Sequence, residues 1–290
     1  MERNQLAEFC NEKYHRDEKC HDCPNEVCHD SCINCLENIH NVNTKDRTYN
    51  CSNIAYCYTC KYIYRYSSEI EHLLETYINV FKKTKKLNIC SIGCGPCSEL
   101  FGLYSFKRKH NWEFDIEFNG FDLNPIWEPI HNKINELISC KTAFLTENVF
   151  DYYAKSDKLP NILVLNYVLS DILRTNPEEF DNFVNNLCAL YKEMPKSFII
   201  INDINLGANK DQVRFHFDPI SHKIKEENSI RHEVKRHFSS SLGNYWHYGN
   251  EYRNNNIVVS PTEEISGRFN PWQECRSAQL VMFKEVSEWY

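Results

Sequence analysis

The stretch Cys94-Gly95-Pro96-Cys97 has residue types and spacing that suit two different chemistries. Two cysteines separated by two residues at the start of a helix are the arrangement used for dithiol exchange. Shifted by one residue, Gly93-Cys94-Gly95-Pro96 is a glycine-rich turn between a strand and a helix, where the backbone can bind a nucleotide cofactor.

The surroundings of this stretch favour the glycine turn. A thioredoxin-type site lies near the start of a compact fold of roughly a hundred residues. Here strand and helix patterns continue for nearly two hundred residues after Cys97, and the residue before Cys94 is Gly93 rather than Trp. Gly93 permits a tight turn directly after the apolar run LNICSI, and Gly95 lets the backbone approach a ligand closely.

A carboxylate supplies the second element of a nucleotide site. The strand-like run FNGFD ends at Asp122. A carboxylate at the tip of the second strand can accept hydrogen bonds from both ribose hydroxyls of a bound nucleoside. Taken alone, Asp122 could equally be a turn or cap residue before Asn124-Pro125. A nicotinamide dinucleotide would need a third glycine at the position of Ser98, so that cofactor is disfavoured.

The elements that must position these residues form an alternating pattern. Segments long enough for helices, such as 125–138 and 177–191, separate the strand-like runs LNICSI, FNGFD, TAFL, NILVLNYVL, KSFIIIND and SAQLVMF. This alternation predicts an α/β fold with a mostly parallel sheet covered by helices on both faces. No helix follows SAQLVMF, which could therefore be an antiparallel edge strand.

The first part of the chain has a different composition, which predicts two domains. Residues 1–66 are rich in cysteine and lack long apolar runs, so we expect a small metal-stapled module there and a larger domain over residues 67–290. A helix is expected to begin at Ser68, because Ser68-Glu69-Ile70-Glu71 matches a capping box. Ile70, Leu73 and Leu74 then recur at helical spacing.

The motifs of the larger domain resemble those of a known family. I-G-C-G-P-x-S-E-L after one strand, followed by F-D-L-N-P at the end of the next, is similar to class I, Rossmann-like S-adenosylmethionine-dependent methyltransferases over roughly residues 68–290. The resemblance implies a Rossmann-like sandwich with a seven-stranded sheet whose last strand is antiparallel. It also implies S-adenosyl-L-methionine bound at the carboxyl ends of the first strands.

The resemblance assigns a role to individual positions. The glycine turn wraps the amino-acid end of the cofactor, the carboxylate takes the ribose, Leu123 lies against the adenine, Asn148 accepts from the adenine amino group, and Asn166 lies near the reacting methyl. The implied cofactor-binding residues are therefore Ser91, Gly93, Cys94, Gly95, Asp122, Leu123, Asn148 and Asn166.

The sequence departs from the family pattern at three positions. Ser91 stands where the family often has an acidic residue, Cys97 replaces the third glycine of the loop, and Asn148 replaces an aspartate. No general base is assigned. Tyr167, Asp171 and Asp203 follow strand ends and are candidates for the substrate side, although each could equally be a cap or helix residue.

Cysteine spacing in the first part of the chain indicates metal binding. Of the 15 cysteines, nine fall within residues 1–60. The N-terminus has no apolar signal region and no run is long enough to span a membrane, so we expect a cytoplasmic protein whose thiols stay reduced. Three Cys-x-x-Cys pairs and two further cysteines match two four-cysteine zinc sites, with the expected ligands Cys20, Cys23, Cys28, Cys32, Cys35, Cys51, Cys57 and Cys60. An iron-sulfur cluster is the lesser alternative.

The substrate is the least determined feature. Between KSFIIIND and SAQLVMF lies a long segment rich in basic and aromatic residues, which suits RNA or a phosphorylated metabolite, although a solvated helix explains its charge equally well. Tyrosines 56 to 66 alternate with Lys61 and Arg65, and they either stack on nucleic acid or pack the small module against the larger domain. The net charge of -7 argues mildly against general nucleic-acid binding.

The resemblance implies a methyltransferase, and with the observations above we expect it to act on a macromolecule, with RNA favoured over protein and no membrane partner. The alternative is a non-catalytic protein in which a degenerate methyltransferase fold binds S-adenosylmethionine or nothing, and the cysteine-rich module holds a protein partner.

Overall fold

The computed structural model describes most of the chain, namely residues 2–14, 32–39, 49, 51–78, 85–194, 197–204, 217–228, 230–238, 250–252 and 259–284. Three predicted metal ligands, Cys20, Cys23 and Cys28, lie outside these residues, as does much of the basic and aromatic segment. Among the helices within them, none combines the length and the apolar character needed to cross a bilayer.

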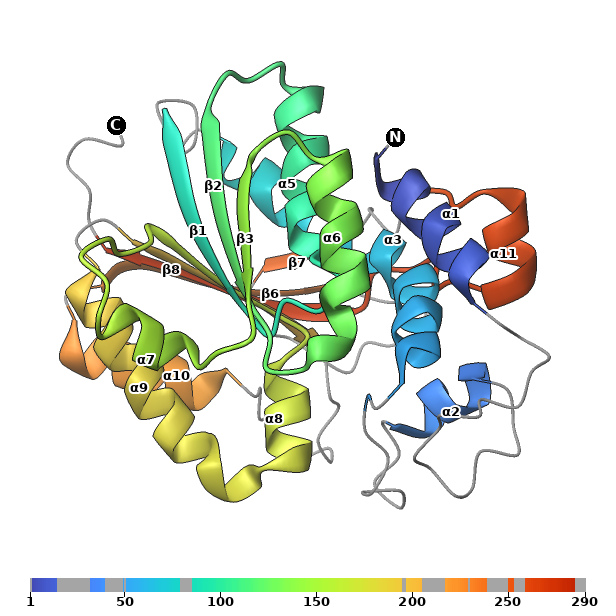
Figure 1. The fold of residues 1–290 in the computed structure, drawn as a ribbon. Coiled ribbons are helices and arrows are strands. Elements are labelled where there is room, and N and C mark those ends of the chain that lie inside the picture. The colour runs from blue at the N-terminus through green and yellow to red at the C-terminus, as the bar shows by residue number, and fades with distance from the viewer. Residues whose placement is uncertain are drawn as a thin grey trace.

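A single sheet of eight strands organises the described residues (Figure 1). Its order is β3-β2-β1-β4-β5-β8-β6-β7. The strands are β1 (Lys86–Ile92), β2 (Asp115–Phe121), β3 (Lys141–Leu145), β4 (Ile162–Asn166), β5 (Phe198–Ile204), β6 (Ile230–Phe238), β7 (Asn250–Tyr252) and β8 (Ser277–Lys284). The first five pair in parallel, whereas β8 is antiparallel to both β5 and β6.

This topology confirms the predicted α/β class and the mostly parallel sheet with an antiparallel last strand. The prediction that SAQLVMF forms an edge strand is wrong, because β8 lies between β5 and β6 and is paired on both sides. Its residues from Ser277 to Phe283 are all buried, which suits an interior strand. The short strand β7 extends the expected seven-stranded arrangement at the β6 edge.

Helices cover both faces of the sheet. They are α1 (Glu2–Lys13), α2 (Cys32–Ile39), α3 (Ser52–Thr76), α5 (Ser98–Lys109), α6 (Glu128–Leu137), α7 (Val149–Tyr153), α8 (Leu169–Thr175), α9 (Phe180–Glu193), α10 (Asp218–Glu227) and α11 (Glu263–Phe269). Alternate residues of β4 enter different cores. Ile162 and Val164 pack with α3, α5 and α6, while Leu163 and Leu165 pack with α7, α9 and α10.

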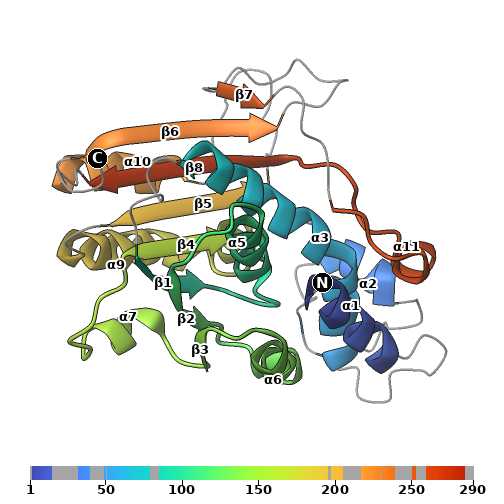
Figure 2. The same cartoon turned by 90° about the horizontal axis from the view of Figure 1, so that it is seen from above.

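Helix α3 begins sixteen residues earlier than the sequence predicted, at Ser52 instead of Ser68. Ser68 lies inside the helix, where its hydroxyl donates to the Tyr64 carbonyl oxygen at 2.7 Å. A serine in this position can bond to the preceding turn as well as cap a helix, and the burial of the residues before it extends the helix. Helix α3 therefore runs unbroken through residues 66 and 67, between the sheet and helices α1, α2 and α11 (Figure 2).

The tyrosines of α3 pack inside the protein, as one of the two interpretations predicted. Tyr58, Tyr62 and Tyr66 are at most 8% exposed. The rings of Tyr62 and Tyr66 stack at 5.3 Å, and Tyr66 stacks in turn on Tyr167 at 3.6 Å. Tyr62 and Tyr66 are thus packed inside the protein and unavailable as stacking surfaces for nucleic acid, and Tyr66 joins α3 to Tyr167 at the end of β4.

Helices α3 and α5 approach closely at Gly102. A Cβ atom at this position would lie 2.5 Å from the Ser67 carbonyl oxygen and 3.0 Å from the Ile70 Cβ. Any side chain there would push the two helices apart. Gly267, on the surface of α11, has no neighbouring atom within 4 Å of such a Cβ.

We therefore expect opposite effects from two glycine-to-alanine substitutions. Gly102→Ala should lower the free energy of unfolding by roughly 1–3 kcal/mol, because overpacking moves α3 from α5. Gly267→Ala should raise it by about 0.5–1 kcal/mol, because alanine restricts the unfolded chain and favours helix. Urea denaturation followed by circular dichroism measures both. Equal effects would show that close helix packing does not explain Gly102.

Candidate cofactor site

The loop between β1 and α5 has an unusual backbone. Gly93, Gly95 and Cys97 have φ angles of 64°, 44° and 54°, all in the left-handed region. A Cβ on Gly93 would lie 2.3 Å from a methyl carbon of Val168. Glycine at position 93 is therefore required both by conformation and by the close approach of the chain after β4.

Asp122 lies against this loop, at the carboxyl end of the neighbouring strand. Its Oδ2 accepts a hydrogen bond from the Gly95 amide at 2.9 Å, and its Oδ1 accepts one from the Asn124 amide at 3.0 Å. Parallel pairing of β1 and β2 places both strand ends at one edge of the sheet. The structure thus brings together the two elements on which the sequence prediction depended.

The environment of Asp122 is only partly polar. Burial raises the pKa of its carboxyl to about 6, and the charge of Asp171 acts in the same direction. The two backbone amides lower the pKa and so limit the rise. At neutral pH the group is therefore still mostly a carboxylate and can accept hydrogen bonds from a ligand.

A cavity of about 380 Å³ opens at this edge of the sheet. Its volume falls within the range of small-molecule sites, roughly 300–1,000 Å³. Leu123 is 70% exposed and lies at the same cavity. Of the eight cofactor positions expected from the sequence, seven line it: Gly93, Cys94, Gly95, Asp122, Leu123, Asn148 and Asn166.

Ser91 is the expected position that does not line the cavity. Its hydroxyl donates to the Glu99 carboxylate in the first turn of α5. Position 91 is where the family pattern often has an acidic residue. Here Glu99, from the following helix, places a carboxylate beside that position. The sequence reasoning missed this residue, although an acidic residue in the first turn after a glycine loop was a visible signal.

Glu99 is 4% exposed, and burial raises its pKa to about 7. Asn166, at the end of β4, donates to Glu99 at 3.3 Å and to the Ser98 hydroxyl at 3.2 Å. The side-chain oxygen of Asn166 accepts from Asn202 at 2.8 Å. Asn166 therefore links the cavity wall to a buried polar network and is not free to rotate toward a ligand.

Asn148 also has a structural role. It is the N-cap of α7, and its side-chain oxygen accepts from the Phe150 amide at 2.9 Å and from the Asp151 amide at 3.4 Å. The oxygen expected to accept from an adenine amino group is thus already engaged by the helix. Asn148 is exposed at the cavity, so any contact with a ligand would share that oxygen.

Tyr167 forms the wall beside Asn166, in a strained conformation. Its φ angle is 59°, which is uncommon for a residue with a large side chain. Its hydroxyl donates to Glu69 at 2.8 Å and accepts from Arg65 at 2.9 Å. The Glu69 carboxylate also accepts from Asn202 at 3.1 Å and from the Arg276 amide at 2.9 Å. This network and the stacking on Tyr66 hold the ring in place.

The two aspartates expected on the substrate side have different positions. Asp171 lines the cavity, and burial raises its pKa to about 6 despite the nearby Arg174. Asp203 is 1% exposed, and its carboxylate accepts from the Ser170 amide at 3.1 Å near the start of α8. Asp171 therefore remains a substrate-side candidate, whereas Asp203 acts as a helix cap.

The N-terminal part of the chain contributes to the cavity wall. Tyr49 and Tyr58 both line it, and their rings make an edge contact at 5.5 Å. Tyr49 also lies 6.2 Å from the Trp127 ring, and its carbonyl oxygen accepts from the Asn124 side chain at 2.6 Å. The cavity is thus built from both predicted domains.

Five predicted metal ligands lie among the described residues. Cys32 and Cys35 are on α2, Cys51 precedes α3, and Cys57 and Cys60 are on α3. The Cys60 thiol donates to the Ala7 carbonyl oxygen at 3.4 Å. Within the described ranges, the one group of three or more potential ligands with all ligand atoms within 4.8 Å of one another is Cys94, Cys97 and His131.

No protein-family model matches the sequence, and no curated protein matches it. Among solved structures, the chain is similar to a Listeria monocytogenes protein described as a class I S-adenosylmethionine-dependent methyltransferase, with 12% identity and a TM-score of 0.45 over 77% of this chain and 60% of that one. A Clostridium thermocellum protein described as an rRNA methylase gives 12% identity and a TM-score of 0.43 over 74% and 95%. Likenesses at this level carry no conclusion about activity.

The burial of Glu99 predicts a specific pH dependence of stability. Its folded pKa of about 7 exceeds the ordinary value of 4.5, so its contribution to stability is complete below pH 4.5 and is lost as the pH rises through 7. The total loss is up to about 3 kcal/mol. Glu99→Gln lacks this titration.

We therefore expect the unfolding free energy of the wild type, relative to Glu99→Gln, to fall between pH 4.5 and 7.5. Urea denaturation at a series of pH values measures it. Asp122 and Asp171 titrate in both proteins, so their contributions to the difference in unfolding free energy cancel to first order. A difference that is constant with pH would contradict this account of Glu99.

Proposed function

We propose that the chain binds S-adenosyl-L-methionine in this cavity and transfers its methyl group to a macromolecule, with RNA ahead of protein. The observation that carries the proposal is the convergence of the Gly93–Gly95 turn and the Asp122 carboxylate on one cavity, with the Gly95 amide 2.9 Å from Asp122. Fold resemblance alone would not suffice, because one fold hosts many functions.

The residues present fit the cofactor's parts. The left-handed turn exposes backbone for the amino-acid end, and Asp122 suits a ribose diol as a double acceptor. Leu123 and the aromatic side chains Phe121 and Phe150 offer apolar contacts for adenine along the same cavity. Ser98 in place of a third glycine disfavours a dinucleotide, whose pyrophosphate needs close approach to the helix start.

When bound, the cofactor would supply a methyl group on a sulfonium sulfur for an in-line displacement. The task of the protein is then to align the nucleophile and exclude water. Tyr167, held by Arg65, Glu69 and Tyr66, offers a rigid wall at the end of β4. Asp171 lines the same cavity, with a pKa raised to about 6 that suits it to accept a proton.

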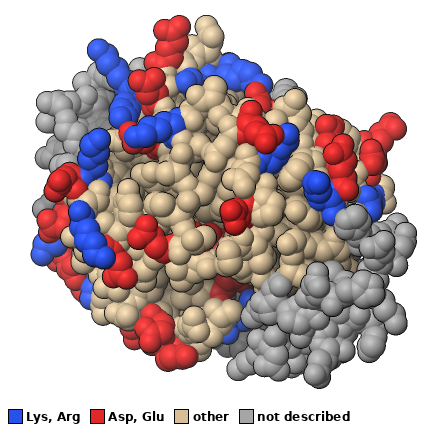
Figure 3. Space-filling model, in the orientation of Figure 1, with Lys and Arg blue, Asp and Glu red and all other residues tan. Residues whose placement is uncertain are grey.

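The preference for RNA depends on the basic and aromatic residues between β5 and β8. Two of these are used inside the protein: Lys235 pairs with Asp218 at 2.8 Å, and Arg236 lies over the Tyr77 ring. On the face in Figure 3, basic and acidic side chains are interspersed, so its described part carries no continuous basic patch. We therefore favour a local contact with the substrate over a broad electrostatic footprint.

We also propose that the cysteine-rich segment binds zinc, with two ions on the eight predicted cysteines. Burial, and then the neighbouring thiols of Cys32, Cys35 and Cys51, raise the pKa of the Cys57 thiol. Among the described residues no three of these four sulfurs all lie within 4.8 Å of one another, so this proposal rests on the spacing of the cysteines in the sequence. A cytoplasmic location and a protein partner for this segment are part of the same proposal. Metal analysis with a visible spectrum tests it, because an iron-sulfur cluster would colour the protein.

The second candidate function is binding without catalysis. The observation that favours it is the engagement of Asn148 and Asn166 with the protein itself, together with the turning of Ser91 away from the cavity. In this case the cofactor or its product would bind and no methyl group would be transferred.

Isothermal titration with S-adenosylhomocysteine tests the cofactor site. We expect one molecule to bind per chain, and Asp122→Asn to weaken binding by about 10- to 100-fold, because charge-assisted hydrogen bonds contribute about 1.5–3 kcal/mol.

Wild-type affinity should fall as the pH drops below about 6, the pKa of Asp122, since the protonated form is a poorer acceptor. Asp122→Asn should lack this fall and Asp171→Asn should keep it. Unchanged affinity in Asp122→Asn would refute the proposed ribose contact.

Incubation with radiolabelled S-adenosylmethionine and fractionated cell extract separates the two functions. We expect label in RNA, and no label when Asp122→Asn replaces the wild type at low cofactor concentration. Label in protein instead would correct the substrate class. Binding of S-adenosylhomocysteine without transfer to any fraction would favour the non-catalytic alternative.

A further inference from the structure

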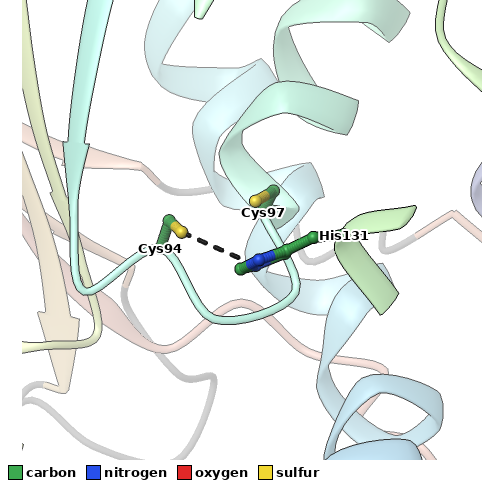
Figure 4. A group of neighbouring side chains, drawn as sticks. All are labelled: Cys94, Cys97 and His131. Carbon is green, nitrogen blue, oxygen red and sulfur yellow. Dashed lines mark hydrogen bonds between the residues drawn. The ribbon is translucent and has the colours of Figure 1, made fainter. Parts of the chain in front are cut away.

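Three potential metal ligands meet at the loop between β1 and α5, called the cofactor loop below (Figure 4). Cys94 lies in the loop, Cys97 precedes α5, and His131 lies on α6. The Cys94 sulfur is 3.8 Å from His131 Nε2, and all three ligand atoms lie within 4.8 Å of one another. Their residues are 4%, 0% and 6% exposed. A buried cluster of two thiols and an imidazole has the donor set that zinc prefers.

The backbone at Cys97 is costly for a cysteine. Its φ angle of 54° is left-handed, a conformation that costs an L-residue roughly 1–2 kcal/mol and that glycine adopts freely. The presence of cysteine instead of glycine at position 97 is explained if the cysteine side chain has a role that glycine could not fill. The Cys97 sulfur lies within the cluster beside Cys94 and His131, which gives the side chain such a use.

Two neighbouring residues make room for the cluster and orient it. Gly120, near the end of β2, has no Cβ, and a Cβ there would lie 2.9 Å from the Cys94 sulfur. The His131 ring stacks on Phe144 at 4.3 Å with an angle of 15° between planes. This stacking aims Nε2 at the loop, where its N–H donates to the Gly95 carbonyl oxygen at 2.7 Å; a metal ion bound at Nε2 would replace this hydrogen bond. Burial lowers the pKa of His131 to about 4, so the imidazole is neutral, as a ligand must be.

We propose that Cys94, Cys97 and His131 bind one Zn²⁺ ion, at a site distinct from the N-terminal cysteines. Zinc bonds of about 2.3 Å to sulfur and 2.0–2.1 Å to nitrogen give a tetrahedral sulfur-to-nitrogen separation of about 3.6 Å, close to the observed 3.8 Å. Two thiolates neutralise the ion, so the buried site carries no net charge. Binding releases two thiol protons to solvent, and the imidazole changes tautomer: its proton moves from Nε2 to Nδ1 as zinc replaces the hydrogen bond to Gly95.

A disulfide between the two cysteines is the competing use of the same residues. Dithiol exchange requires an accessible thiolate. Both residues are buried, at 4% and 0% exposed, so an external thiol or disulfide does not reach them. The site therefore favours a metal ion over redox exchange. Bound zinc would tie the cofactor loop to α6 and fix the backbone at Gly93 and Gly95, whichever ligand the cavity takes.

Zinc content of the full-length chain tests the proposal. Cys97→Gly removes one ligand and also suits the left-handed backbone, so this variant should fold; His131→Gln removes another and can still donate to Gly95. We expect each variant to contain one zinc ion fewer per chain than the wild type by elemental analysis. Cys188→Ala, which removes a buried thiol on α9 outside the cluster, should retain the wild-type content.

Cobalt substitution supplies a second measurement. The wild type loaded with Co²⁺ should show thiolate-to-cobalt absorption that decreases in Cys97→Gly and not in Cys188→Ala. Equal zinc content in wild type, Cys97→Gly and His131→Gln would overturn the proposal, as would a Cys94–Cys97 disulfide found by peptide mapping of the purified wild type. Neither measurement depends on cofactor binding, so failure here is distinguishable from failure of the proposed function.

Discussion

One buried carboxylate, that of Glu69, joins the parts of the molecule that form the cavity. It is fully buried, and it accepts hydrogen bonds from α3 itself through Arg65, from the end of β4 through Tyr167, from β5 through Asn202 and from the start of β8 through Arg276. A buried charge is tolerated only when it is paired and its lone pairs are satisfied. The position of α3 and the ends of three strands are therefore fixed by a single group, and the strained Tyr167 is held by the same contacts.

The loop between β1 and α5 combines two kinds of residue, each suited to one of the two proposed uses. Gly93, Gly95 and Cys94 line the cavity beside Asp122, and the sulfurs of Cys94 and Cys97 lie close to His131 of α6. The sequence could suggest both uses, because glycine and cysteine each have a distinct local meaning. It could not show that they coexist, since that depends on where α6 packs and on the absence of a side chain at Gly120.

Features encoded locally were predictable and features decided by tertiary contacts were not. The strands of the parallel sheet and the meeting of Gly95 with Asp122 follow from apolar runs and from the rule that parallel strands end at one edge. The start of α3 was missed because Ser68-Glu71 has a capping pattern, yet burial of the preceding tyrosines extends the helix. The place of β8 between two strands depends on long-range packing that no local pattern contains. The pairing of Ser91 with Glu99 is local, and the acidic residue in the first turn after the glycine loop was its signal.

Tyr49 and Tyr58 in the cavity wall have a consequence for the energetics of the whole chain. A ligand that touches these rings would bind the folded chain and not the unfolded one, and by reciprocity it would stabilise the packing of Tyr49 and Tyr58 against Trp127. Occupancy of the cavity and the docking of α3 would then be thermodynamically linked. Tyr49 and Tyr58 would in this sense belong to the binding site, and their substitution would register as a change in affinity.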